Sequence, residues 1–315
     1  MSEFDLIQRF FTRATPGAIL GVGDDAALLH VAEGMELAVS TDMLVSGTHF
    51  LPDADPFLLG HKTLAVNLSD LAAMGAVPRW ATLALSLPAA DTDWLQRFST
   101  GFFALADEHG VELVGGDTTR GPLCLSVTIM GEVPRGKALR RSGAEAGDDI
   151  WVSGMLGHAA LGLAHLQGRT ELPEDVRVCC LAALHQPQPR VALGLALRDI
   201  ASSAIDISDG LLADLGHILE RSHAGAEVKF DEIPTGIARA IDEPLFRHCV
   251  LSGGDDYELC FTACAAKRSE IEAVAKRLGL PLTRIGKIVT GQGCTVRSAK
   301  DGVMTIKESG YDHFA

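Results

Sequence analysis

Residues 56–74 read PFLLGHKTLAVNLSDLAAM, and this stretch decides the fold class of the first half of the chain. Its apolar side chains recur at steps of three and four residues, the spacing of one buried face of an α-helix. The apolar segments on either side, residues 36–45 and 80–87, have the composition of strands. A strand, a helix and a second strand in this order predict an α/β arrangement.

The same alternation continues outward from this stretch and restarts after a change of composition. Residues 133–149 are rich in Pro, Gly and paired charges, which indicates a linker. We therefore predict two domains, residues 1–137 and residues 148–315, in a mixed α/β (α+β) fold. The other expected strands are 111–114, 123–131, 150–153, 204–207, 226–230 and 258–262, and the other expected helices are 91–109, 157–167, 174–185, 190–199 and those beginning at Leu211 and Lys267.

The charge balance argues against two classes of partner. The chain has 27 Lys plus Arg and 41 Asp plus Glu, so its formal net charge is −14 at pH 7. Nucleic-acid affinity rests mainly on basic side chains that neutralise phosphates, and anionic membranes also attract basic surfaces. We therefore expect neither a nucleic-acid partner nor a membrane.

The sequence favours the cytoplasm. No apolar run approaches the ~18 residues that a membrane-spanning helix needs. The first residues lack the basic segment and the apolar run of a secretory signal. The seven cysteines include no Cys-x-x-Cys pair, which indicates reduced thiols.

Short carboxylates recur at turns, at expected strand ends and on one polar helix face. The segments are Gly23-Asp24-Asp25, Ser40-Thr41-Asp42 at the close of a strand, Asn67 with Asp70 on one helix face, Gly115-Gly116-Asp117 at a strand end, and Asp206-Ile207-Ser208-Asp209-Gly210 between a strand and a helix. Each of these segments also has a purely structural interpretation, since Gly-Asp pairs form turns and Asp209 is placed to cap the helix that begins at Leu211. Asp206 lies in a strand expected to be buried, so its carboxylate needs a partner.

These residue types favour Mg²⁺. Carboxylates and hydroxyls are hard oxygen ligands, and the chain has no cluster of His or Cys at metal-ligand spacing. Mg²⁺ is usually held together with substrate phosphates, so we expect a phosphorylated substrate. Neither the P-loop nor the Gly-x-Gly-x-x-Gly motif is present. The turns at Gly115-Gly116 and Gly253-Gly254 and the pair Arg140-Arg141 remain as candidate phosphate contacts.

Taken together and in order, the motifs identify a family. The chain resembles the thiamine-monophosphate kinases, members of the superfamily that includes aminoimidazole ribonucleotide synthetase and selenophosphate synthetase. The resemblance runs nearly end to end and is specific because the motifs occur together. Besides the segments above, it rests on Gly47-Thr48-His49-Phe50, the run from Lys62 to Ala76, Arg141-Ser142-Gly143-Ala144, Ser252-Gly253-Gly254-Asp255-Asp256-Tyr257-Glu258-Leu259 and Gly310-Tyr311-Asp312-His313-Phe314.

The resemblance implies ATP-dependent phosphorylation of thiamine monophosphate to thiamine diphosphate, the last step of thiamine diphosphate biosynthesis, with several Mg²⁺ ions. It also implies a two-domain fold in which the first domain binds ATP and Mg²⁺ and forms the sheet of a homodimer, and the second completes the nucleotide and substrate site. The implied metal ligands are Asp25, Ser40, Thr41, Asp42, Asp70, Asp117, Asp206 and Asp209. The implied ATP contacts are Gly116, Asp117, Arg141 and Ser208, the implied substrate contacts are His49, Asp255 and Tyr311, and the residues expected to act in catalysis are Asp42, Asp70, Asp117, Arg141 and Asp209.

Three alternatives concern single residues. Relatives often have Glu where this chain has Asp255, so the shorter side chain has less reach toward the substrate. His49, beside Phe50, could serve in packing instead of substrate binding. Tyr311 could belong to a loose tail instead of the substrate pocket.

The expected chemistry is direct in-line transfer without a general base. The acceptor is a phosphate monoester whose second pKa is about 6, so it is already largely ionised at neutral pH. Metal ions and a cation such as Arg141 would stabilise the transferring phosphoryl group. The rival readings are ribotide or selenide chemistry within the superfamily, and a catalytically silent nucleotide or Mg²⁺ sensor. The first cysteine, Cys124, lies in an apolar strand and disfavours selenide, and the ending Gly310 to Phe314 disfavours the ribotide.

Overall fold

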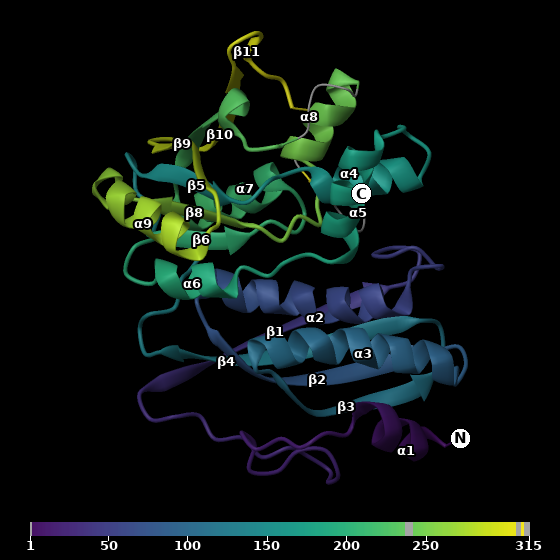
Figure 1. The fold of residues 1–315 in the computed structure, drawn as a ribbon. Coiled ribbons are helices and arrows are strands. Elements are labelled where there is room, and N and C mark those ends of the chain that lie inside the picture. Colours follow the sequence, from purple (N-terminus) through teal and green to yellow (C-terminus); the bar gives the residue numbers. More distant parts are fainter. Residues whose placement is uncertain (1, 237–241, 307–309, 312–315) are drawn as a thin grey trace. The chain divides into compact units, whose positions relative to one another are not determined.

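The computed structural model describes residues 2–236, 242–306 and 310–311, and it separates into two units (Figure 1). The first unit comprises Met1–Leu71 and Ala76–Gly136, and the second comprises Ala72–Gly75 and Lys137–Ala315. The two α/β halves expected from the sequence are confirmed. Among the described residues, no helix is both long enough and apolar enough to cross a bilayer.

The first unit is built on a four-stranded sheet of order β1-β4-β2-β3. Only β2 and β3 run parallel, and the other neighbours are antiparallel. The elements, after a short α1 (Glu3–Leu6) and a π-helical turn (Ile7–Phe11), are β1 (Met35–Val45), α2 (Pro56–Ala73), β2 (Val77–Leu87), α3 (Thr92–His109), β3 (Glu112–Arg120) and β4 (Cys124–Pro134).

Two glycines let α2 and α3 pack closely together. A Cβ on Gly60 would lie 2.1 Å from the carbonyl oxygen of Phe98, and one on Gly101 would lie 1.9 Å from that of Phe57. Both distances are shorter than any real contact, so only glycine allows this approach. Phe98 and Phe102 of α3 are fully buried in the core of this unit.

The structure corrects two expected strand ends. Ser40, Thr41 and Asp42 lie in the middle of β1, because β1 pairs with β4 over its whole length from Met35 to Val45. Gly115, Gly116 and Asp117 lie inside β3, because pairing with β2 continues to Arg120. Gly116 has a φ of 149°, and a Cβ there would lie 1.9 Å from the Leu83 carbonyl oxygen.

The second unit is built on a seven-stranded sheet of order β11-β10-β7-β9-β5-β8-β6. Its strands are β5 (Asp149–Ser153), β6 (Ser203–Asp206), β7 (Gly225–Lys229), β8 (Leu259–Ala263), β9 (Leu282–Val289), β10 (Gly293–Ser298) and β11 (Gly302–Val303). Its helices are α4 (His158–Leu166), α5 (Glu174–His185), α6 (Val191–Leu197), α7 (Leu211–Ser222), α8 (Glu243–Leu251) and α9 (Arg268–Leu278), with 3-10 turns at Phe230–Glu232 and Ala265–Lys267.

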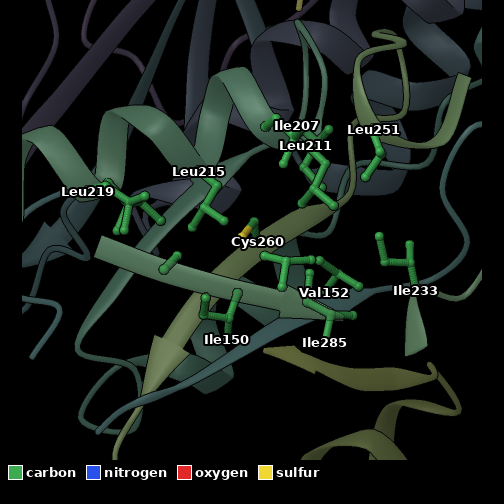
Figure 2. Close-up of a cluster of buried hydrophobic side chains, with 14 of the residues drawn as sticks. Ile150, Val152, Ile207, Leu211, Leu215, Leu219, Ile233, Leu251, Cys260 and Ile285 are labelled. Carbon is green, nitrogen blue, oxygen red and sulfur yellow. The ribbon is translucent and has the colours of Figure 1, made fainter. Parts of the chain in front are cut away.

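Helix α7 supplies one side of the core of the second unit. Leu211, Leu215 and Leu219 point from α7 toward the strands, where Ile150 and Cys260 meet them (Figure 2). All five side chains are nearly or fully buried. This packing holds the start of α7 against the sheet, and therefore holds the loop that connects β6 to α7.

Candidate active site

In the first unit, β1 and α2 bring Ser40, Asp42 and Asp70 toward one another. Ser40 Oγ donates a hydrogen bond to Asp70 Oδ2 at 2.5 Å. The Asp42 amide donates to Asn67 Oδ1 at 3.1 Å, and Asn67 Nδ2 donates to the Thr63 carbonyl oxygen at 3.0 Å. Asn67 and Asp70 therefore share the helix face that looks onto β1, as their three-residue spacing predicted.

Thr41 points to the other face of the same sheet. Successive side chains of a strand alternate between faces, so Thr41 lies opposite to Ser40 and Asp42. Its hydroxyl is hydrogen-bonded to that of Thr128 on β4, at 2.8 Å. The structure does not bring the Thr41 side chain to the Ser40–Asp70 pair.

A cavity of about 600 Å³ in the first unit gathers three of the other predicted residues. Asp25, Gly116 and Asp117 line it, together with Asp24. Hydrophobic side chains of the first residues line it as well, among them Phe4 and Phe11. Asp24 was not in the predicted site, although its place beside Asp25 in the Gly-Asp-Asp turn was a signal for it.

In the second unit, the predicted acids lie at the connection from β6 to α7. Asp206 ends β6 and is buried, with 5% of its surface exposed. Ser208 and Asp209 follow it, and Gly210 precedes the first helical residue with a φ of 125°. Asp209 does not cap α7, because the N-cap residue is Gly210 and it makes no side-chain cap bond.

Asp214, the fourth residue of α7, instead binds the main chain of the loop before the helix. Its Oδ2 accepts the backbone amides of Ser208, Asp209 and Gly210, each at 3.1 Å. Burial raises the pKa of Asp214 to about 7, and the charge of Asp209 acts in the same direction, against the effect of the three amides. Sequence reasoning missed Asp214, for which the only signal was an acid in the first turn of α7.

The predicted substrate residues of the second unit meet the same loop. The amide of Asp255 donates to the carbonyl oxygen of Ser208 at 2.8 Å, and the amide of Tyr311 donates to that of Asp209 at 3.0 Å. Asp255 is held with a φ of 69°, and its Oδ1 accepts a hydrogen bond from the Tyr257 hydroxyl at 3.2 Å. Tyr311 is thus docked at the main chain of the acidic loop, while 53% of its surface stays exposed.

Arg141 is placed at the other end of α7. Ser222, the last residue of α7, donates from its hydroxyl to the Arg141 carbonyl oxygen at 3.3 Å. Since α7 has 12 residues, it rises about 18 Å from the Asp209 loop to this point. The structure therefore does not bring the main chain of Arg141 to that loop, and any contact with nucleotide phosphate falls to its exposed side chain.

His49 lies just beyond β1 in the first unit. Its Nδ1 accepts a hydrogen bond from the Val45 amide at 3.0 Å, within a turn that Ser46 and Phe50 close. One ring nitrogen therefore has a structural task, and the imidazole is held in a defined orientation.

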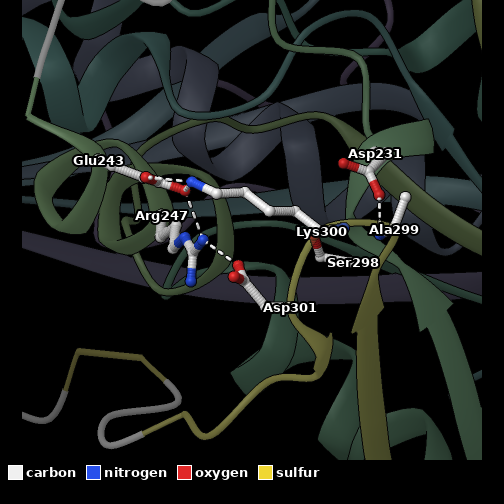
Figure 3. Close-up of polar contacts among 7 residues, drawn as sticks. All are labelled: Asp231, Glu243, Arg247, Ser298, Ala299, Lys300 and Asp301. Atoms are coloured by element: carbon white, nitrogen blue, oxygen red, sulfur yellow. Dashed lines mark hydrogen bonds and ion pairs between the residues drawn. The ribbon is translucent and has the colours of Figure 1, made fainter.

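A second cavity, of about 500 Å³, lies between α8 and the segment that follows β10. Ion pairs hold its wall, since Arg247 pairs with Glu243 and Asp301, and Lys300 pairs with Glu243 at 3.1 Å (Figure 3). Basic and acidic groups are balanced here, and none of the predicted site residues lines this cavity.

The predicted residues of both units offer ligands that suit a hard cation. Most of them carry carboxylate or hydroxyl oxygens, and His49 is the one imidazole among them. Within the residues that the structure describes, no three His, Cys, Asp or Glu side chains stand close enough together to hold a metal ion by themselves.

Comparison with known proteins places the chain in a family. Residues 23–133 match the N-terminal domain of the AIR synthase related proteins, and residues 145–298 match the C-terminal domain. The thiamine-monophosphate kinase of Salmonella typhimurium is 49% identical, over 99% of this chain and 98% of that protein. The chain belongs to the thiamine-monophosphate kinase family.

Solved structures of this family share the fold. The thiamine-monophosphate kinase of Stenotrophomonas maltophilia K279a is 51% identical with a TM-score of 0.84, over 98% of this chain and 96% of that one. AaThiL complexed with AMPPCP and TMP is 29% identical with a TM-score of 0.78, over 99% and 96%. Members of the thiamine-monophosphate kinase family are therefore similar to this chain over both units.

Proposed function

We propose that this chain transfers the γ-phosphoryl group of ATP to thiamine monophosphate, forming thiamine diphosphate and ADP. The observation that carries the proposal is 49% identity to a thiamine-monophosphate kinase along 99% of the chain. A structural relative complexed with AMPPCP and TMP supports the same pair of substrates. The carboxylate and hydroxyl oxygens of both units suit Mg²⁺, which can hold the phosphate groups of a substrate.

The residues present fit Mg²⁺ by their donor chemistry. Mg²⁺ commonly takes one or two carboxylates and completes its shell with substrate phosphates and water. When bound, it would neutralise phosphate charge and polarise the transferring group. The proposed ligands are Asp25, Ser40, Thr41, Asp42, Asp70, Asp117, Asp206 and Asp209, of which Thr41 carries its hydroxyl on the sheet face opposite to Ser40 and Asp42.

The proposed mechanism needs no general base. The acceptor oxygen belongs to a phosphate that is already largely ionised at neutral pH. The task of the chain is to position two polyanions and to balance their charge. In this proposal of direct in-line transfer, Asp42, Asp70, Asp117 and Asp209 act through several bound Mg²⁺ ions, and the exposed Arg141 side chain acts on the nucleotide phosphates.

Five residues have the remaining proposed binding roles. Gly116 and Ser208 would contact the nucleotide, since Gly116 lines the same cavity as Asp25 and Asp117, and Ser208 is fixed next to Asp209. His49, Asp255 and Tyr311 would contact thiamine monophosphate. The main-chain bonds of Asp255 and Tyr311 to the Ser208–Asp209 segment support a shared role for these two residues.

We infer that the chain acts as a homodimer in the cytoplasm, and that its partners are these small molecules and a second copy. Leu37, Val39 and Met43 alternate along β1 on the sheet face turned away from Asn67, and 44%, 56% and 55% of their surfaces are exposed. Removing such an apolar strip from water favours association. The formal charge of −14 weighs against nucleic acid and anionic membranes.

One assay separates this function from its rivals. The purified chain is incubated with ATP, Mg²⁺ and thiamine monophosphate, and thiamine diphosphate is quantified by chromatography. Parallel reactions replace thiamine monophosphate with formylglycinamidine ribotide or with selenide. We expect thiamine diphosphate and equimolar ADP in the first reaction only. ATP binding with no product in any reaction would instead support a silent sensor.

A further inference from the structure

In the loop that joins β6 to α7, residues 207–210, every main-chain amide and carbonyl has a hydrogen-bond partner. The Ile207 amide donates to Glu258, and the Ile207 carbonyl accepts from Tyr257, both at 2.8 Å. The Ser208 and Asp209 carbonyls accept the amides of Asp255 and Tyr311, and the Gly210 carbonyl accepts the amide of Asp214 at 3.0 Å. Every amide from Ser208 to Gly210 donates to Asp214 Oδ2.

This arrangement differs from an anion site at a helix N-terminus. Such sites use free amides of the first helical turn to bind phosphate oxygens. Here the three amides belong to Ser208, Asp209 and the N-cap residue Gly210, before the first turn of α7, and Asp214, with 3% of its surface exposed, already accepts them. Phosphate cannot accept a hydrogen bond from these three amides while Asp214 does, so we expect Ser208 and Asp209 to contact ligands through their side chains.

The loop is also enclosed by backbone on its other side. A Cβ on Gly254 would lie 2.2 Å from the Ser208 carbonyl oxygen, and one on Gly210 would lie 2.7 Å from the carbonyl carbon of Ser252. The Gly253-Gly254 turn thus packs directly against the loop. With Asp214 on one side and this turn on the other, the loop has one well-defined conformation.

We propose that Asp214 is a positioning residue for the reaction: its Oδ2 fixes the main chain of Ser208–Gly210, so that the side chains of Ser208 and Asp209 are held ready for the nucleotide and its cation. The assignment rests on the proposed function for its catalytic consequence. The three hydrogen bonds to Asp214 Oδ2 can be tested without measuring activity.

The test uses the full-length chain and compares Asp214→Asn and Asp214→Ala with the wild type. Asn keeps an acceptor oxygen of similar shape, whereas Ala leaves three amides without a partner. A matched control is Asp91→Ala, which removes an acid that also accepts main-chain amides at the start of a helix, those of Asp93 and Trp94 at 3.0 Å in the first unit.

We expect Asp214→Ala to lower kcat about 100-fold, as misplacement by ~1 Å does elsewhere, with KM for thiamine monophosphate within about threefold of the wild type. Asp214→Asn should keep kcat within roughly tenfold, because its amide oxygen restores the acceptor. Asp91→Ala should leave both constants unchanged. An Asp214→Ala enzyme with wild-type kcat, or a folded Asp214→Asn enzyme as impaired as Asp214→Ala, would overturn the proposal.

Hydrogen–deuterium exchange gives a readout that does not depend on activity. The Ser208–Gly210 amides should be protected in the wild type and exchange at least about tenfold faster in Asp214→Ala, with the rest of α7 unchanged. If Asp214→Ala does not fold, Asp214→Asn decides: protected amides with kcat retained support the proposal, and rapid exchange contradicts it. Protected amides in a wild-type protein that forms no thiamine diphosphate would refute the proposed function while leaving the loop geometry intact.

Discussion

The hydrogen bond between Ser40 and Asp70 gives a prediction for a single hydroxyl. Ser40→Ala removes the donor that orients the Asp70 carboxylate. Partners that orient metal-ligating groups contribute roughly 10–100-fold to metal affinity or activity, and Ser40 is itself a proposed ligand, so we expect the Mg²⁺ concentration for half-maximal rate to rise by at least about that factor. The rate is measured against Mg²⁺ at saturating ATP and thiamine monophosphate.

The matched control for Ser40→Ala is Thr100→Val, which removes a hydroxyl from α3 of the same unit, where it donates to the Gln96 carbonyl oxygen at 2.6 Å. Its Mg²⁺ dependence should equal that of the wild type. Equal shifts in both variants would show that the effect does not come from the Asp70 carboxylate.

His109, near the end of α3, gives a prediction about pH. Burial lowers its pKa below 6.5, with neighbouring Glu108 opposing and His61 reinforcing the effect. The unfolded chain therefore binds the proton more readily than the folded one. Its contribution to stability is present above about pH 6.5 and is lost as the pH falls through the lowered pKa.

We therefore expect His109→Gln to flatten the pH dependence of stability. Urea unfolding followed by circular dichroism at pH 7.5 and 5.5 should show a smaller loss of unfolding free energy in the variant than in the wild type. A larger loss in the variant would mean that His109 is stabilised in its charged form.

For single residues, sequence patterns predicted the acidic connection between β6 and α7 but not the residue that supports it. Asp206, Ser208 and Asp209 were predicted as site residues because acids and glycine stand between a strand and a helix, and the structure places them on that connection. Asp214 was missed because its role depends on three amides that only the folded loop turns toward it. Strand alternation within β1 contained the information that Thr41 faces away from Ser40, yet the motif alone grouped them.

Helix packing in the first unit depends on Gly101 of α3. Gly101→Ala would place a Cβ 1.9 Å from the Phe57 carbonyl oxygen, so α2 and α3 must move apart. Overpacking of this kind typically costs about 1–3 kcal/mol of unfolding free energy. Chemical denaturation of the variant measures the loss.

Gly216→Ala is the matched change in α7, where nothing lies within 4 Å of the new Cβ. It should raise the unfolding free energy by roughly 0.5–1 kcal/mol, because alanine has the higher helix propensity. Equal effects at positions 101 and 216 would contradict the close approach of α2 and α3.

At the element scale, strong periodicity gave boundaries within a few residues. Residues 36–45 and 56–74 were expected, and β1 and α2 span Met35–Val45 and Pro56–Ala73. The expected strand 111–114 was too short, because Gly115-Gly116-Asp117 lacks strand propensity and pairing with β2 overrides it. Helix α8 and strands β9, β10 and β11 were not predicted: Gly, Lys and Arg interrupt the apolar residues of β9 and β10, and β11 has only 2 residues.

For the whole molecule, the exposed strip on β1 predicts how copies associate. Val39→Glu places a charge in the centre of this strip, so we expect sedimentation equilibrium to show a dimer for the wild type and a monomer for the variant. Val178→Glu changes the same residue type at similar exposure, 57%, on α5 in the second unit, and should remain dimeric. A monomeric wild type would contradict the proposed homodimer.

A single-turnover reaction with ATP labelled at the γ-phosphate follows phosphoryl transfer from ATP directly to thiamine monophosphate. The purified chain, in excess over ATP, is mixed with Mg²⁺ and thiamine monophosphate, quenched at intervals and resolved into protein, nucleotide and thiamine fractions. We predict that the label passes from ATP to thiamine diphosphate with matching rates of loss and gain, and that none is bound to protein. Label trapped on the protein before product appears, or ATP consumed without labelled thiamine diphosphate, would contradict it.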